Sequence, residues 1–236
     1  MKFPALFRRR SLVLPTLMGW FVILLACGLG ALYLFRGIAD FLTVHDPVDA
    51  EYLVIEGWMS KEELDQSLDY FNSADYRLAI IVGGPITNDF HDIDSSEAER
   101  AAGYLRGQGL AQDRSVVIAT PYSAQNRTFL NAVMTRDWFA RQGIELSRLD
   151  VFSGNVHTRR SRDLYQLAFG DEVTVGVIPS RPKDFDAAHW WQSSASGKYV
   201  AVEFAGWLLV KCCFSPGEPG SHLEKWGIEK SPANAS

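Results

Sequence analysis

A histidine and three arginines follow the end of an apolar run in the second half of the chain. The run LDVF (149–152) is broken by Ser-Gly-Asn, and a helical pattern then carries His157, Arg159, Arg160 and Arg162. His157 and Arg160 share one face of such a helix. An imidazole can transfer a proton, and a guanidinium can bind an oxyanion. We therefore predict His157 as a catalytic residue and Arg160, with Arg159, as ligands of a phosphate or carboxylate. The alternative is a solvated first turn capped by the histidine.

Polar and glycine residues follow the other apolar runs in the same way. They are Gly83 and Gly84, then Asn126, Arg127 and Thr128, and finally Ser153 and Asn155. Because the carboxyl ends of parallel strands meet at one edge of a sheet, these residues can be neighbours. The glycine pair would let a ligand approach the backbone, or would serve a tight turn, and both readings stay open. We predict that all seven residues contribute to an anion-binding site.

Glu97 opens a predicted helix shortly after the Gly-Gly pair, so it is a second catalytic candidate, as a general base or a hydroxyl acceptor. Plain stabilisation of the helix N-terminus is the favoured alternative. His91, Asp92 and Asp94 could bind a divalent ion together with His157, but their spacing fits no metal motif and favours a solvated loop. Dinucleotide, P-loop and nucleophile-elbow motifs are absent. We predict neither a metal nor a cofactor.

Five short apolar runs alternate with helical patterns along the body of the chain. The predicted strands are 52–55, 78–82, 116–119, 149–152 and 173–178, and the predicted helices between them are 60–73, 95–109, 125–142 and 155–168. Nearly continuous apolar strands are typical of parallel sheets buried on both faces. The pattern predicts an α/β fold, a Rossmann-like three-layer sandwich around a mainly parallel five-stranded sheet.

The C-terminal part is less regular. Residues 179–196 contain His189-Trp190-Trp191, and a last helix follows over 197–214. Lys198, Glu203 and Lys211 interrupt that helix, which indicates a buried or membrane-surface helix rather than a second span. We expect Glu203 to be the buried partner of an arginine. The polar tail, 215–236, is expected to be disordered.

An uncharged stretch near the N-terminus predicts a membrane anchor. Three arginines at 8–10 precede an uncharged run from Ser11 to Phe35, which Arg36 closes. This length can span a bilayer. The basic cluster places the N-terminus in the cytoplasm, and the body in the periplasm or its equivalent. A cleaved signal peptide, or lipid attachment at Cys27, is the less favoured alternative because the apolar run continues past that cysteine. We divide the chain into 1–36 (stub and anchor), 37–50 (connector), 51–214 (domain) and 215–236 (tail).

Charge and cysteine content limit the functions of the body. Residues 37–236 hold 18 basic and 28 acidic residues, a net charge of −10, which excludes nucleic-acid binding by bulk electrostatics. Any anion must therefore be bound by a local arginine cluster. Cys212 and Cys213 are neighbours, and a bridge between adjacent residues would be strained, so we expect no disulfide framework.

The order of these motifs resembles the SanA/ElyC/YdcF-like proteins of bacterial envelopes, a domain family of unknown function. The resemblance covers about residues 51–214 and rests on Val82-Gly83-Gly84-Pro85, Ser96-Glu97-Ala98, SAQNRTFLN (123–131) and SGNVHTRR (153–160). It implies one N-terminal anchor and a role in envelope biogenesis. It points to Gly83, Gly84, Glu97, Asn126, Thr128, Ser153, His157 and Arg160 as site residues. The chain departs from the pattern at Arg127, and at Glu56-Gly57-Trp58 after the first strand.

Together these features predict a single-pass inner-membrane protein whose extracytoplasmic domain binds an anionic, phosphorylated envelope metabolite, such as a lipid-linked precursor of peptidoglycan. If it is an enzyme, hydrolysis or transfer at a phosphate or sugar-phosphate group is the expected reaction. One alternative is a non-catalytic scaffold or sensor that contacts an envelope protein through Trp190, Trp191 and the last helix. The other is a nucleotide-cofactor enzyme.

Overall fold

The computed structural model describes residues 14–86, 96–123 and 126–227, which divide into two units between Gly37 and Ile38. The described part of the first unit contains one helix, α1 (Leu17–Arg36). Thr16 caps it, with its hydroxyl accepting from the amide of Gly19. Twenty residues at about 1.5 Å rise match the hydrocarbon thickness of a bilayer, and none of them is buried within the protein. This helix is long and apolar enough to cross a membrane, in agreement with the predicted anchor.

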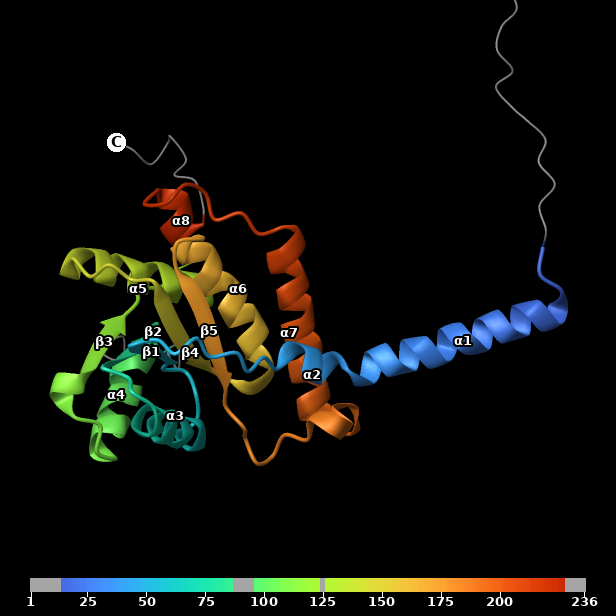
Figure 1. The fold of residues 1–236 in the computed structure, drawn as a ribbon, viewed down its shortest axis with the longest axis horizontal. Coiled ribbons are helices and arrows are strands. Elements are labelled where there is room, and N and C mark those ends of the chain that lie inside the picture. The colour runs from blue at the N-terminus through green and yellow to red at the C-terminus, as the bar shows by residue number, and fades with distance from the viewer. Residues whose placement is uncertain (1–13, 87–95, 124–125, 228–236) are drawn as a thin grey trace, which may run out of the picture. The chain divides into compact units, whose positions relative to one another are not determined.

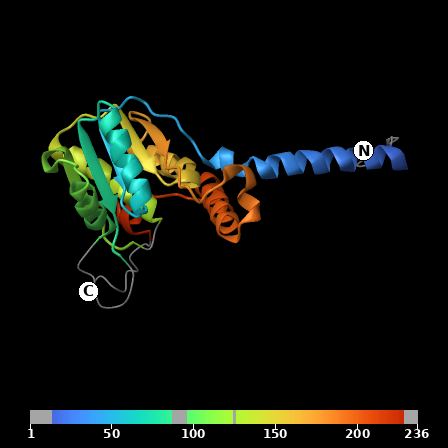
Figure 2. The same cartoon turned by 90° about the horizontal axis from the view of Figure 1, so that it is seen from below.

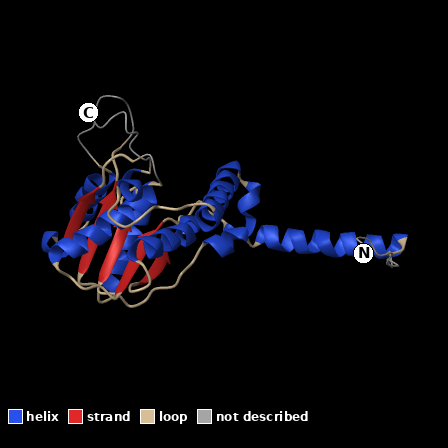
Figure 3. Cartoon of the chain, turned by 90° about the horizontal axis from the view of Figure 1, so that it is seen from above, coloured by secondary structure: helices blue, strands red, loops and turns tan. Residues whose placement is uncertain are grey.

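The second unit is built on a five-stranded sheet in the order β3-β2-β1-β4-β5 (Figures 1 and 3). Its strands are β1 (Tyr52–Glu56), β2 (Leu78–Gly83), β3 (Ser115–Ala119), β4 (Arg148–Ser153) and β5 (Thr174–Pro179). Every neighbouring pair is parallel. All five predicted strands are confirmed, and the sheet is parallel throughout.

Helices cover both faces of the sheet, which confirms the three-layer sandwich (Figure 2). On one face, α3 (Lys61–Ser73) and α4 (Glu97–Gly107) bury leucines, Phe71 and alanines against β1 and β2. On the other, α5 (Arg127–Gln142) and α6 (Thr158–Phe169) bury Phe129, Phe139, Leu164 and Tyr165. Both faces of the sheet are therefore covered by helices, as the nearly continuous apolar sequences of its strands predict.

A fourth layer packs against α6. It contains α2 (Ile38–Leu42), the 3-10 helix η3 (Ala187–Gln192) and α7 (Ser194–Cys212), and its core includes Ala39, Leu42, Trp190 and Val200. Trp190 is only 5 % exposed, so this half of the Trp190-Trp191 pair packs in the core rather than offering a surface to a partner. The last predicted helix is present and begins three residues earlier than expected.

The connector (residues 38–50) is fixed to the sandwich by polar contacts. Asp46 forms an antiparallel bridge with Val177 at the edge strand β5. The buried carboxylate of Asp150, in β4, accepts from the amides of Val48 (2.9 Å) and Ala50 (3.2 Å) and from the Tyr76 hydroxyl (2.9 Å). Its desolvation is thereby compensated by three donors.

One expectation about the C-terminal part is wrong. The tail forms a helix, α8 (His222–Trp226), whose Glu224 is 2 % exposed and accepts from Arg136 of α5 at 2.6 and 3.0 Å. Hydrogen bonds to a buried partner order this segment despite its polar composition; residues 228–236 lie outside the described residues. Cys212 and Cys213 form a disulfide, which joins neighbours at the end of α7 and closes no loop of the fold.

Candidate functional site

The site lies where the strand order of the sheet reverses direction. From β1 the chain proceeds through β2 to β3 on one side, and β4 and β5 lie on the other side of β1. The connections of β1 and β4 therefore diverge, and a crevice opens above their carboxyl ends. Glu56 ends β1 and Ser153 ends β4, so these two side chains form the floor of the crevice.

Glu56 is completely buried on this floor. Its carboxyl accepts from Ser153 Oγ (2.5 Å), from Ser161 Oγ (3.2 Å) and from Trp58 Nε1 (3.3 Å). Three donors on one carboxyl are what an ionised acceptor requires when it is removed from water. Sequence reasoning did not select Glu56 as a site residue. The available signal was a charged residue at the end of an otherwise apolar strand.

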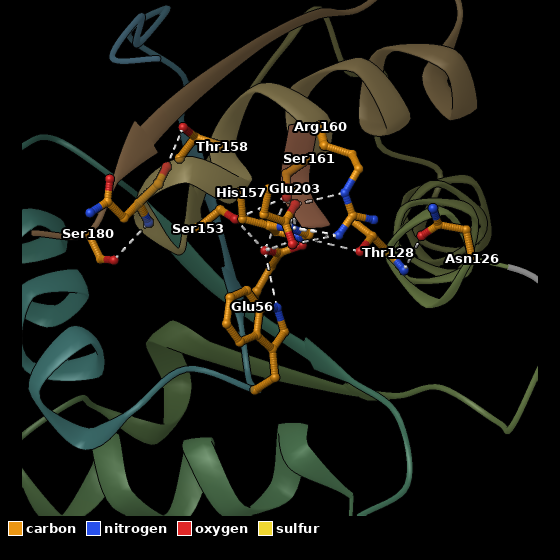
Figure 4. Close-up of polar contacts among 12 residues, drawn as sticks. Glu56, Asn126, Thr128, Ser153, His157, Thr158, Arg160, Ser161, Ser180 and Glu203 are labelled. Atoms are coloured by element: carbon orange, nitrogen blue, oxygen red, sulfur yellow. Dashed lines mark hydrogen bonds and ion pairs between the residues drawn. The ribbon is translucent and has the colours of Figure 1, made fainter. Parts of the chain in front are cut away.

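His157 lies directly above this carboxyl, between two glutamates (Figure 4). It ends the 3-10 turn η2 (Asn155–His157) and is 4 % exposed. Nδ1 is 2.8 Å from Glu203 Oε2, while Nε2 is 3.3 Å from Thr128 Oγ1 and 3.8 Å from Glu56 Oε2. Arg160 Nη2 also lies 3.0 Å from Nδ1, so this nitrogen faces a donor as well as an acceptor. Because the contact with the Glu203 carboxylate is the shorter one and a carboxylate only accepts, we assign the hydrogen of the neutral ring to Nδ1 and the lone pair to Nε2.

Glu203, from the inner face of α7, joins His157 to Arg160. Arg160 Nε donates to Glu203 Oε2 (2.9 Å), and Arg160 Nη2 donates to Oε1 (3.1 Å), a bidentate pair. Burial opposes ionisation of this carboxyl, but hydrogen bonds and charge from His157 and Arg160 outweigh it and lower the pKa of Glu203 to about 2. The geometry agrees with the expectation that Glu203 is the buried partner of an arginine.

A cavity of about 380 Å³ opens above these groups. Eleven residues line it: Trp58, Gly84, Glu97, Asn126, Arg127, Thr128, Asn131, His157, Arg160, Tyr199 and Glu203. Seven of them were among the sequence candidates. Trp58, Asn131, Tyr199 and Glu203 were not, because the two aromatic residues and the amide carry no motif, and Glu203 was read as a structural partner.

The N-terminus of α5 forms one wall of the cavity. Asn126 caps the helix, with Oδ1 accepting from the amide of Thr128 (3.2 Å). Deeper in the wall, Asn131 Oδ1 accepts from Thr120 Oγ1 (2.9 Å). Arg127 is exposed at the mouth and forms no ion pair with any described residue. This wall therefore combines a guanidinium with the positive end of a helix dipole.

Glu97 lies on the opposite wall, at the first residue of α4. The cap of α4 is made by Ser96 and Glu99, which form a complete capping box, so Glu97 is not needed for it. Burial raises the pKa of the Glu97 carboxyl, with Arg127 and Arg100 opposing the rise. A carboxyl placed in a cavity and biased towards its protonated form can donate or accept a proton.

Two glycines make room for these walls. A Cβ on Gly83 would lie 2.8 Å from the Ala98 amide nitrogen, so Gly83 is required for α4 to pack on β2 and does not itself line the cavity. A Cβ on Gly154 would lie 2.5 Å from the ring of Trp58. That missing side chain lets the Trp58 ring meet His157 edge to face, with centroids 5.2 Å apart.

The remaining sequence candidates lie outside the cavity and fix neighbouring elements. The Arg159 guanidinium stacks over the Phe41 ring and donates to its carbonyl, so the assignment of Arg159 to the anion site is corrected. The side-chain Oδ1 of Asn155 accepts from Thr43 Oγ1 (2.8 Å), and its backbone N–H donates to Ser180 Oγ (3.0 Å). Ser153 donates to Glu56 within the floor, and Arg162 pairs with Asp46 (3.2 Å).

The arginine cluster read from the sequence is therefore dispersed. Only Arg160 of its three members reaches the cavity, and Glu203 neutralises it. Among the described residues, no group of three or more His, Cys, Asp or Glu is arranged to hold a metal ion. His91, Asp92 and Asp94, which were weighed as metal ligands, lie outside the described residues.

Comparisons of the chain with protein-family models, with curated proteins and with solved structures found no match in any of the three.

Proposed function

We propose that the protein is a single-span membrane protein whose α/β domain binds a phosphorylated, anionic metabolite of the cell envelope and acts on it by hydrolysis or transfer. The observation that carries the proposal is His157, buried in the cavity wall with Nδ1 fixed by Glu203 (2.8 Å) and Nε2 next to Oγ1 of Thr128 (3.3 Å), which also lines the cavity. A carboxylate that orients an imidazole in this way is a recurrent arrangement for general acid–base catalysis.

The role of His157 follows from its tautomer. With Nδ1–H held by Glu203, Nε2 accepts the proton of an attacking water or hydroxyl group, and the resulting imidazolium is stabilised by Glu203 and by Glu56. The same nitrogen then returns the proton to the leaving oxygen. Thr128 Oγ1 lies 3.3 Å from Nε2 and belongs to the cavity wall, so it marks the side of the imidazole from which the reacting group must approach.

The anion is assigned to the α5 wall. Arg127 offers a guanidinium at the mouth of the cavity, and the first turn of α5 offers backbone N–H groups. The opposite side suits a sugar, because the Trp58 ring supports a sugar face and Glu97 and Tyr199 present hydrogen-bonding groups. A sugar phosphate, free or attached to a lipid, combines both kinds of contact.

The sequence supports the location of the activity. The arginines at 8–10 precede the span, so we place the N-terminus in the cytoplasm and the domain in the periplasm or its equivalent. The resemblance to the SanA/ElyC/YdcF-like proteins agrees with a role in envelope or peptidoglycan-precursor biogenesis. A reporter enzyme that is active only outside the cytoplasm, fused to the C-terminus, tests this: activity is expected, and its absence would reverse the orientation.

Mass spectrometry of small molecules that copurify with the full chain in detergent tests the binding function. We expect a phosphorylated envelope metabolite with the wild-type protein and with Arg159→Ala, since Arg159 lies outside the cavity. Arg127→Ala should lose it. His157→Ala should retain it uncleaved, with conversion reduced by about 10²–10⁴-fold. Recovery of a nucleotide cofactor and no envelope metabolite would refute the proposal.

A further inference from the structure

Helix α7 has an inner face that belongs to the site and an outer face that no described part of the chain covers. Val200 and Glu203 on the inner face are buried. On the outer face Val202 is 58 % exposed, Leu208 44 % and Leu209 61 %, with exposed alanines between them. A helix that is apolar on both sides is normally enclosed by protein or in contact with lipid.

The acidic residue of α7 and its basic residue Lys198 lie on different sides of the helix. Its one acidic residue, Glu203, is turned inward to His157 and Arg160. The charges exposed to solvent are Lys198 and Lys211, the latter also paired with Asp163 at 3.0 Å. Lys211 faces α6 through this ion pair, so the outer face carries a single charge, the ammonium of Lys198. On a body of net charge −10, an outer face with a cation and no acidic residue is complementary to the anionic headgroups of a membrane.

The chain itself brings this layer close to the predicted span. α2 packs on α7 through Ala39 and Leu42 against Val200, and the Phe41 ring meets Trp207 at 4.9 Å. α2 begins at Ile38, and Gly37 is the single residue between it and the end of α1. Two peptide units reach about 7 Å at most. The last residue of the proposed span and the first residue of α2 are therefore within this distance of each other along the chain.

We propose that α7 is an interfacial helix, whose outer face (Val202, Leu208 and Leu209) rests in the headgroup region of the membrane that α1 crosses. The inference depends on the proposed membrane anchoring and extends it, because it assigns a second, peripheral contact to the body. A helix is about 10 Å thick. The cavity wall formed by Tyr199 and Glu203 would thus be separated from lipid by the width of α7 alone.

A fluorescence experiment on the full chain tests this contact. An environment-sensitive label is attached to Leu209→Cys, and for comparison to Gly103→Cys, in a background with Cys27, Cys212 and Cys213 replaced by serine. Gly103 is exposed on α4, on the other face of the sheet, where an added Cβ meets no atom within 4 Å. The variants are reconstituted in vesicles of phosphatidylethanolamine and phosphatidylglycerol that contain nitroxide-labelled lipid. Native Cys27, labelled alone, reports on the insertion of α1.

We expect the label at 209 to be quenched by the nitroxide several-fold more than the label at 103, and to emit at shorter wavelength. Equal, weak quenching at both positions, with strong quenching at Cys27, would overturn the interfacial contact and leave the anchor intact. Protection of position 209 from aqueous iodide without lipid quenching would show a protein or a second copy on this face, and would also overturn it. An unquenched label at Cys27 would remove the anchor and this inference together.

Discussion

His157 is held from two sides by carboxyl groups that come from opposite ends of the chain. Glu203 fixes Nδ1 from α7, and Glu56 lies 3.8 Å from Nε2 at the end of β1. Neither side chain can shift without leaving a buried charge unpaired, which is costly. The imidazole is therefore positioned before any ligand binds, a condition for efficient proton transfer.

The first prediction concerns Glu203 and pH. Its pKa is lowered from 4.5 to about 2 in the folded protein, so its stabilisation is complete above pH 4.5 and is lost as pH falls towards 2. The loss amounts to about 3 kcal/mol at most. Glu203→Gln should flatten the pH dependence of the unfolding free energy in this window, measured by urea titration in detergent. The exposed Glu172→Gln serves as control; an unchanged slope in Glu203→Gln would contradict the prediction.

The second prediction compares two buried serines. Ser153 and Ser67 are both 0 % exposed, but Ser153 donates to the Glu56 carboxyl (2.5 Å) and Ser67 to the Leu64 carbonyl of its own helix (2.7 Å). A hydrogen bond to a charged acceptor contributes about 1.5–3 kcal/mol, and one to a neutral acceptor about 1 kcal/mol. Ser153→Ala should therefore lower the unfolding free energy more than Ser67→Ala. Equal losses would mean that Glu56 does not need its third donor.

At the scale of elements, the site depends on how closely α4 approaches the sheet. The Ala98 amide nitrogen lies 2.8 Å from the position that a Cβ of Gly83 would take, and Glu97, the first residue of α4, lines the cavity next to this contact. The helix start and the strand end are thus packed without an intervening side chain.

The third prediction tests this packing. Gly83→Ala should displace α4 and cost about 1–3 kcal/mol of unfolding free energy through overpacking. Gly103→Ala, in the middle of the same helix and open to solvent, should instead stabilise by up to about 1 kcal/mol because alanine favours helix. Thermal unfolding followed by circular dichroism measures both. A neutral Gly83→Ala would show that α4 adjusts freely.

The elements were more predictable than the site because they depend on local patterns. The strands were visible as apolar runs, and the starts of α3 and α4 were visible as serines followed by glutamates. The partners of Arg159 and Arg160 could not be predicted in this way. Neighbouring residues on a helix point about 100° apart, so Arg159 contacts α2 and Arg160 contacts α7. Only the way in which α2 and α7 pack on α6 decides which arginine reaches the cavity.

At the scale of the whole molecule, the C-terminal tail belongs to the folded body at least as far as Gly227. Glu224 accepts from Arg136 twice and from the Gly220 amide (2.5 Å), and Ser123 donates to the Lys225 carbonyl (3.1 Å). Composition could not show this, because the tail is polar and a single buried carboxylate orders it.

The fourth prediction follows from that carboxylate. Glu224→Ala should release α8, and amide hydrogen exchange over residues 218–227 should approach the rate of an unstructured peptide. The exposed Glu218→Ala should keep the slow exchange of the wild type. Mass spectrometry of peptic fragments reads out both variants. Persistent protection in Glu224→Ala would assign the order of the tail to its apolar contacts.

The connector has a mechanical consequence. Any tension on the chain at Gly37 must pass through residues 38–50, which are fastened at Thr43 to Asn155, two residues before His157, and at Asp46 to the edge strand β5. A pull would load the contacts of α2 with α7 and Arg159 first and the Thr43–Asn155 bond next, before it loads the sheet. The proposed membrane anchor would thereby transmit tension to the turn that carries the imidazole, and we expect the proposed proton transfer to weaken under load before the body unfolds.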